Sequence, residues 1–168
     1  MSKLVRIIAH WSVTEYKADD DCKRHYHYSF EGDGTEVAGI MRPEANENVE
    51  DGIYCGHTRN CNQGSIGVSC ASMGGAVWPG KTPEQYGKFP VTQKQFEAMC
   101  LRIAKLCKRY AIPISKTTVL MHGEVQKTLL IQQRGKWDIG VLPYMNLWTI
   151  EACGDYMRKL VTGNMSKV

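Results

Sequence analysis

Residues 4–10 read LVRIIAH, a short apolar run that ends in a histidine. Runs of this length, bounded by Gly, Asp or Ser, are typical of strands inside a sheet. Four further segments have the same character. The predicted strands cover residues 4–10, 26–31, 35–40, 66–71 and 117–121. A Gly-Asp-Gly turn between the second and third of them predicts a hairpin.

Two segments have the period of an amphipathic helix. The first begins at Thr92, where Gln95 is placed to complete a capping box, and it ends before Pro113. The second covers residues 146–160. Because strands alternate with helices, we predict an α/β fold with a central, mainly mixed β-sheet of about five strands flanked by helices. The length of 168 residues is enough for a complete core, so one domain over residues 1–168 is expected.

Charge and composition argue against several classes of protein. The net charge is +4, and the basic residues are scattered without a nucleic-acid-reading motif. No apolar stretch approaches the length of a membrane span, and the N-terminus lacks the apolar core of a secretory signal. Seven cysteines at irregular spacing fit reduced thiols better than a disulfide framework. We therefore expect a monomer that is made in the cytoplasm and binds no nucleic acid.

Three polar residues stand at the edges of apolar runs. His10 ends the first predicted strand, His122 ends TVLMH at residues 118–122, and Asp138 lies in GKWDIG at residues 135–140. Two neutral imidazoles and one carboxylate are a standard ligand set for a catalytic zinc ion, because three protein ligands leave a fourth position open for water. Strand ends hold such ligands rigidly. The pattern therefore indicates one zinc ion (Zn2+) per chain and a hydrolytic reaction.

Five segments, in order along the chain, resemble those of a known family. They read IIAHWSVT at residues 7–14, YHYSFEGDGT at 26–35, HTRNCNQGSIGV at 57–68, HGEV at 122–125 and KWD at 136–138. Their content and order resemble the zinc-dependent N-acetylmuramoyl-L-alanine amidase family, in particular its phage-lysozyme-type and peptidoglycan-recognition-protein branch. The resemblance leaves only the C-terminal helix without a diagnostic motif.

This resemblance implies a role for each matching residue of the site. His10, His122 and Asp138 correspond to the zinc ligands. Tyr26 corresponds to the active-site tyrosine of the family. Lys136 corresponds to the lysine that stabilises the oxyanion formed during amide hydrolysis.

Three further residues match positions around the family's site. His57 and Asn62 are expected to contribute to the substrate groove. Glu124 follows the second ligand in a His-x-Glu pattern, and we expect it to support or orient His122 from behind. Cys55 and Cys61 flank His57, but their spacing matches no common zinc pattern.

Two departures from the family pattern affect the site. Ser69 stands where another branch of the family has a glutamate general base. A hydroxyl group is no base near neutral pH, so the acceptor of the water proton is open between metal-bound hydroxide, Tyr26 and Asp138. Only 15 residues separate His10 from Tyr26. The helix that family members carry there is therefore expected to be shortened or lost, which would open one side of the groove.

The resemblance implies hydrolysis of the amide bond between N-acetylmuramic acid and the L-alanine of peptidoglycan. The compact chain resembles a bacteriolytic phage or prophage endolysin that reaches the cell wall, in the periplasm, after release. The alternatives are a secreted antibacterial amidase effector, a non-catalytic peptidoglycan-recognition module and a cysteine peptidase. A recognition module would lack a zinc ligand, and no nucleophile motif supports a peptidase. The long loop at residues 74–90 is either a wall of the groove or a plain insertion.

Overall fold

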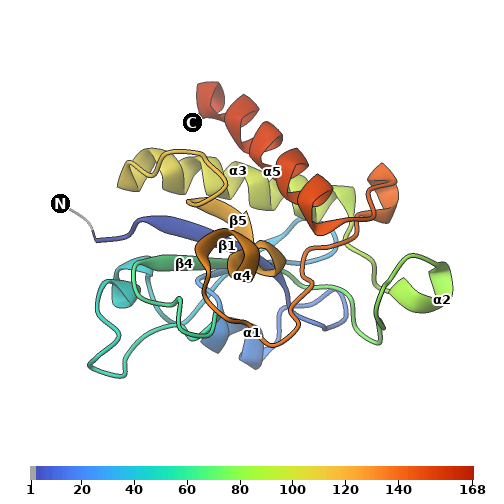
Figure 1. Cartoon of the computed structure of the whole chain (residues 1–168), viewed down its shortest axis with the longest axis horizontal. Helices are drawn as coiled ribbons and strands as arrows, with labels where there is room; N and C mark the ends of the chain where they lie inside the picture. Colours follow the sequence, from blue (N-terminus) through green and yellow to red (C-terminus); the bar gives the residue numbers. More distant parts are fainter. Residues whose placement is uncertain (1–2) are drawn as a thin grey trace.

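The computed structural model describes residues 3–168 and contains one five-stranded sheet. The strands are β1 (Arg6–Trp11), β2 (Tyr28–Phe30), β3 (Glu36–Ala38), β4 (Ser65–Cys70) and β5 (Val119–Met121). Their order in the sheet is β3-β2-β4-β1-β5. β3 is antiparallel to β2, and all other neighbours are parallel. The predicted mixed α/β fold is therefore confirmed, with β1 lying between β4 and β5 (Figure 1).

Strand β1 shows how the sheet divides the molecule, because successive side chains of a strand point to opposite faces. Ile7, Ala9 and Trp11 belong to the main hydrophobic core, whereas Ile8 belongs to a small separate cluster. His10 has the same parity as Ile8 and lies on its side of the sheet. We call the side of Ile7, Ala9 and Trp11 the core face, and the side of Ile8 and His10 the polar face.

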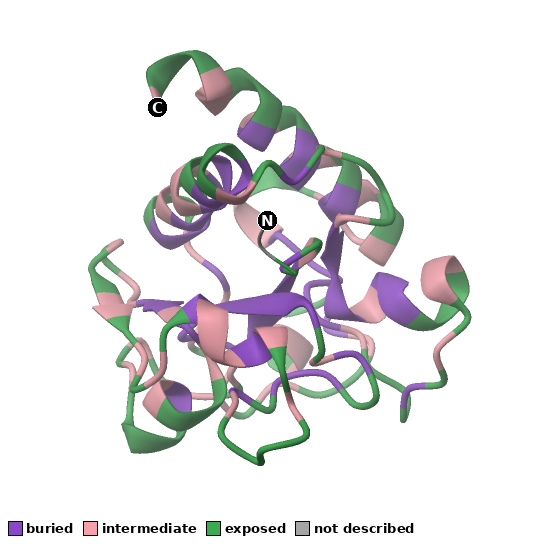
Figure 2. Ribbon diagram, turned by 90° about the vertical axis from the view of Figure 1, so that its left-hand side faces the viewer, coloured by how far each residue is buried: buried purple, intermediate pink, exposed green. Residues whose placement is uncertain are grey.

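Two long helices cover the core face (Figure 1). Helices α3 (Gln93–Tyr110) and α5 (Ile150–Asn164) pack against each other, and they contact β2, β4 and β5. Thr92 and Gln95 form the predicted capping box at the start of α3. The buried parts of both helices face inward and the exposed parts face solvent (Figure 2). This layer supplies most of the apolar packing that stabilises the fold.

The start of α5 differs from the prediction. The helix begins at Ile150, not at residue 146. Thr149 caps it by accepting a hydrogen bond from the backbone N–H of Ala152 at 3.1 Å. The residues before the cap form a 3-10 turn, η3 (Pro143–Met145), which ends at Asn146 in the left-handed conformation and so does not continue into the helix.

A six-residue helix, α1 (Asp20–His25), lies in the connection from β1 to β2. Asp19 caps it by accepting a hydrogen bond from the backbone N–H of Cys22 at 2.8 Å. The connection thus keeps a helix of less than two turns, as its short length predicted. Tyr26 ends this helix instead of opening the strand, so β2 begins two residues later than predicted, at Tyr28.

The remaining elements are short. They are η1 (Pro43–Glu47), α2 (Pro83–Tyr86), η2 (His122–Glu124), α4 (Val125–Leu129) and η4 (Met165–Lys167). Helix α4 packs on the polar face, where Val125 joins Ile8 and Leu120 in the small cluster. All seven cysteines are free and buried. Within residues 3–168, no helix combines the length and apolar character needed to cross a membrane.

Candidate metal centre

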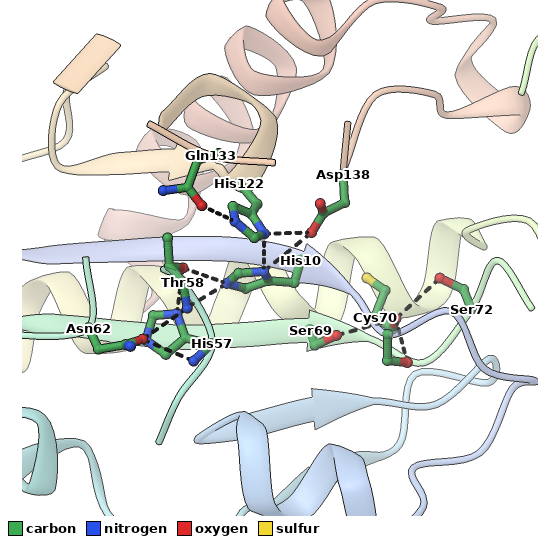
Figure 3. A network of polar contacts seen from close by, with 11 residues as sticks. His10, His57, Thr58, Asn62, Ser69, Cys70, Ser72, His122, Gln133 and Asp138 are labelled. Carbon is green, nitrogen blue, oxygen red and sulfur yellow. Dashed lines mark hydrogen bonds and ion pairs between the residues drawn. The ribbon is translucent and has the colours of Figure 1, made fainter. Parts of the chain in front are cut away.

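Three segments on the polar face bring His10, His122 and Asp138 together (Figure 3). His10 stands in β1, His122 directly follows β5, and Asp138 lies in the loop between α4 and α5. All three side chains are buried, and one potential ligand atom of each lies within 4.8 Å of the other two. Among residues 3–168, no other cluster of histidine, cysteine and acidic side chains has this arrangement.

The spacing of the three atoms fits a tetrahedral zinc ion. The Nδ1 atoms of His10 and His122 lie 3.1 Å apart. Asp138 Oδ2 lies 3.2 Å from His10 Nδ1 and 3.4 Å from His122 Nδ1. Zinc binds such atoms at about 2.0–2.2 Å, so two ligands of one tetrahedron lie about 3.3–3.6 Å apart. The observed triangle differs from this geometry by only a few tenths of an ångström.

Gln133 sets the tautomer of His122. The Nε2 atom of His122 lies 2.9 Å from Gln133 Oε1. The orientation of this amide is fixed, because Gln133 Nε2 donates to the carbonyl oxygen of Arg59 at 2.8 Å. Gln133 Oε1 is therefore an acceptor, so in the neutral, metal-binding form of His122 the imidazole proton resides on Nε2. The Nδ1 atom of His122 is left with a lone pair that points toward Asp138.

His57 sets the tautomer of His10 in the same way. His57 Nε2 donates to the carbonyl oxygen of Ser65 at 3.2 Å, which leaves its Nδ1 as an acceptor. The N–H of His10 Nε2 faces two acceptors, His57 Nδ1 at 3.2 Å and the Thr58 hydroxyl oxygen at 3.4 Å, and that hydroxyl lies 2.8 Å from His57 Nδ1. The Nδ1 atom of His10 consequently carries a lone pair as well. Burial lowers the pKa of His10 to about 4 despite the nearby Asp138, so the imidazole is neutral at neutral pH.

With both imidazoles in these neutral tautomers, three acceptor atoms converge with no proton among them. Lone pairs at these distances repel one another unless a cation lies between them. The pKa of Asp138 lies below its usual range: burial would raise it, but the contacts with His10 and His122 outweigh that effect. The donor set, its protonation and its spacing thus all fit a divalent metal ion, and zinc is the ion that prefers such ligands.

The loops that carry two of the ligands are tied to each other and to α5. The backbone N–H of Gly123 donates to the carbonyl oxygen of Asp138 at 2.6 Å. Glu124 accepts a hydrogen bond from the backbone N–H of Met121 at 2.8 Å, and both of its oxygens lie 2.9 Å from the guanidinium of Arg158. The turn after β5 is thereby held from both sides.

Glu124 supports His122 in the structural way that was expected, without contact to the imidazole. It contacts the backbone before that residue and pairs with Arg158, which is buried in α5. Gln133 is the residue that contacts the imidazole. Glu124 therefore positions His122 only through the main chain.

A pocket of about 340 Å³ opens over the three ligands, and Tyr26 forms part of its wall. The ring centroids of Tyr26 and His10 lie 5.2 Å apart. Burial and the charge of Asp138 raise the pKa of Tyr26, and Ser69 beneath it opposes the shift only in part. The phenol is therefore protonated at neutral pH and can act as a hydrogen-bond donor to a bound substrate.

Two cations stand at the mouth of the pocket. Lys136 was expected there and lines the pocket with an exposed side chain. Arg134 also lines the pocket, and the sequence motifs did not reveal it. Both precede Asp138 in one loop, so the segment that supplies the carboxylate ligand also supplies positive charge.

The structure places His57 in the wall of the pocket and Asn62 behind it. His57 is 8% exposed, lines the pocket and supports His10. Asn62 is not among the residues that line the pocket, and its Oδ1 accepts hydrogen bonds from the backbone N–H groups of His57 and Thr58, each at 2.9 Å. The geometry thus favours a structural role for Asn62 over the expected contact with substrate.

Sequence reasoning missed Gln133, Arg134, Thr58 and Arg158. The first two lie in QQRGK at residues 132–136, which reads as an ordinary polar surface loop. A signal was available for Arg158, because a cation next to Met157 on the inward side of α5 requires a buried partner. Nothing in the local sequence pairs His122 with Gln133.

Comparisons with known proteins identify the family of the chain. The family model described as N-acetylmuramoyl-L-alanine amidase matches residues 3–140. Among solved structures, the N-acetylmuramoyl-L-alanine amidase LysC from Clostridium intestinale URNW is 15% identical, with a TM-score of 0.52 over 91% of this chain and 87% of that one. The amidase AmiD from E. coli, in complex with the substrate anhydro-N-acetylmuramic acid-L-Ala-D-gamma-Glu-L-Lys, is 16% identical, with a TM-score of 0.54 over 82% of this chain and 53% of that one.

No curated protein sequence matches the chain significantly. At identities this low, the solved structures show a shared fold and nothing finer. The family model is the stronger finding, because it covers most of the chain, including all three candidate ligands. The chain therefore belongs to the N-acetylmuramoyl-L-alanine amidase family and is an enzyme of this class.

Proposed function

We propose that residues 1–168 form a single zinc-dependent amidase domain that cleaves the bond between the lactyl group of N-acetylmuramic acid and the L-alanine of the stem peptide. His10, His122 and Asp138 would hold the zinc ion. Bound zinc would polarise the scissile carbonyl and lower the pKa of a water molecule to about 7. The observation that carries the proposal is the convergence of three buried potential ligand atoms, from His10, His122 and Asp138, in a member of an amidase family.

The residues of the pocket wall would act on the charge that develops during amide hydrolysis. Negative charge grows on the carbonyl oxygen when water attacks, and donors fixed in advance stabilise it. Lys136 and Tyr26 approach the same pocket from different segments. We assign both of them to this oxygen, with Tyr26 as a neutral donor because its raised pKa makes it unsuitable as a base.

Arg134 and Lys136 give the mouth of the pocket a positive charge. Stem peptides carry carboxylates, so this charge would favour the approach of the peptide side of the substrate. We propose peptidoglycan as the polymer on which the enzyme acts, in the manner of a bacteriolytic phage or prophage endolysin. A secreted antibacterial effector is the alternative, and the site chemistry would be the same.

Digestion of purified peptidoglycan tests the proposed bond. The products should be stem peptides with a free L-alanine amino terminus and glycan strands of unchanged length. New reducing ends would instead show a glycosidase, which needs two carboxylates across a sugar bond. New amino groups on diaminopimelate or D-alanine would show an endopeptidase and would overturn the substrate assignment.

A further inference from the structure

Three tryptophan rings contact one another in a row that begins in the core, passes the metal pocket and ends at the surface. Trp137 lines the pocket, and its ring makes an edge-to-face contact with the core residue Trp11 at a centroid distance of 4.6 Å. The ring of Trp78 contacts Trp137 with a centroid distance of 5.5 Å. Trp78 is 68% exposed, and the neighbouring Val77 is 56% exposed. Trp137, Trp78 and Val77 therefore form a continuous apolar surface that begins at the pocket. Such a surface is more informative than a single exposed apolar side chain.

The backbone that carries Trp78 is held in place. The N–H of Val77 donates to the carbonyl oxygen of Gln85 at 2.8 Å, and the N–H of Lys81 donates to Gln85 Oε1 at 2.9 Å. Gly80 packs so closely on the Trp137 ring that an added Cβ would lie 2.8 Å from it. A ring on a fixed backbone loses less conformational entropy when a ligand binds.

The two surfaces next to the pocket differ in charge. Residues 77–80 read VWPG and carry no charged side chain. A neighbouring cleft of about 690 Å³ shares Val13 with the pocket, and Glu15, Asp19 and Lys88 line it. Stem peptides carry carboxylates and amino groups, whereas N-acetylglucosamine units are uncharged. The charged cleft suits a peptide, and the tryptophan surface suits a sugar.

We infer that Trp78 is a sugar-binding platform, on which a ring of the glycan strand stacks beside the metal pocket. A sugar ring presents C–H groups with a small positive charge, and the face of an indole ring is negative. The platform adjoins Trp137, which stands between the candidate ligand Asp138 and Lys136. This inference rests on the proposed function. It adds to the bond that is cut a second contact, through which the enzyme would bind the glycan strand of the substrate.

The first test compares two substrates that differ only in the length of the glycan. We would measure kcat/KM on intact glycan strands that bear stem peptides, and on a soluble muropeptide with a single sugar. The loss caused by Trp78→Ala should be about fivefold to tenfold larger on the strands than on the muropeptide. Trp78→Phe should recover most of it. Ile40→Ala removes another exposed apolar side chain that does not line the pocket, and it should change neither value.

The second test uses a tetramer of N-acetylglucosamine, which has sugar rings but no peptide. Titration should shift the tryptophan fluorescence of the wild type and of Ile40→Ala, but not that of Trp78→Ala. Equal losses on both substrates, or unchanged tetramer binding by Trp78→Ala, would overturn the platform. If the wild type cleaves neither substrate while tetramer binding still depends on Trp78, the platform stands and the proposed amidase function fails.

Discussion

The two faces of the sheet are built on different principles. On the core face, fully buried side chains such as Ile7, Phe96 and Ile103 pack in one hydrophobic core. Their contacts are apolar, and other apolar side chains of similar volume could make them. On the polar face, His10 and His122 are equally buried, but each is held by one specific partner. Apolar packing needs the right volume, whereas a buried polar group needs a particular atom at a particular place. Stability should therefore depend mainly on the first face and chemistry on the second.

Truncation of a core residue should give the largest effect, a loss of stability without a loss of zinc affinity. Ile103→Ala removes a fully buried side chain of α3 and should lower the free energy of unfolding by about 2–5 kcal/mol. Ile103→Val should cost about 0.5–1.5 kcal/mol. Denaturant unfolding measures both values, and a chelator competition measures zinc affinity in the folded variants. A large drop in the zinc affinity of folded Ile103→Ala would show that the faces are not independent.

Substitutions in the pocket wall should lower activity and leave stability unchanged. Lys136→Ala and Tyr26→Phe should each lower kcat by about 100-fold to 1000-fold, because each removes one donor to the developing charge. Zinc content and the free energy of unfolding should stay at the wild-type values, since Lys136 is exposed and Tyr26→Phe preserves the ring. Turnover at the wild-type rate in both purified variants would remove these residues from the mechanism.

Replacement of Gln133, the partner of His122, should lower zinc affinity although all three ligands are retained. Gln133→Leu removes the acceptor that keeps the imidazole proton on Nε2, and zinc affinity should fall by about 10-fold to 100-fold. The matched control is Gln132→Leu at the neighbouring position, which should keep the wild-type affinity. Equal affinity in Gln133→Leu and the wild type would mean that the tautomer is set by the metal alone.

The smallest effect concerns pH and a histidine of the polar face that is not a ligand. Burial lowers the pKa of His27 to about 4, and its Nδ1 accepts the backbone N–H of Gly67 at 3.0 Å. Above the unfolded pKa of 6.5 both states are neutral, and as pH falls toward 4 only the unfolded state takes up the proton. The protein should therefore lose about 1–2 kcal/mol of stability by pH 5 through this residue. Unfolding curves at pH 7 and pH 5 should show a smaller loss for His27→Gln, and an equal loss would contradict the assignment.

The sequence predicted the core face better than the polar face, for a physical reason. Helix α3 follows from local signals, namely the capping box at Thr92 and an apolar stripe with helical period. The start of α5 was misplaced because Leu147 continues the apolar pattern, although it pairs with Leu142 in a short bridge before the cap. Local periodicity cannot show such a competing contact.

In the site, the ordered motifs predicted the ligand positions, but the sequence could not predict the partners of those ligands. Gln133 and His122 are 11 positions apart in irregular chain, and Arg158 reaches Glu124 across 34 positions. The first pairing depends on how the loop before Asp138 folds back toward β5, and the second depends on how α5 packs against β5 and η2. A polar side chain in such a loop has the same sequence appearance whether it faces solvent or a buried imidazole.

The metal content of the purified protein tests the central claim most directly. Elemental analysis should find one zinc ion per wild-type chain, and Asp138→Ala should bind zinc far more weakly. Removal of zinc by a chelator should abolish cleavage of peptidoglycan, and addition of zinc should restore it. Full cleavage by zinc-free protein, or one tightly bound zinc ion per chain after replacement of His10, His122 and Asp138 together, would contradict the assignment of the polar face as a catalytic zinc site.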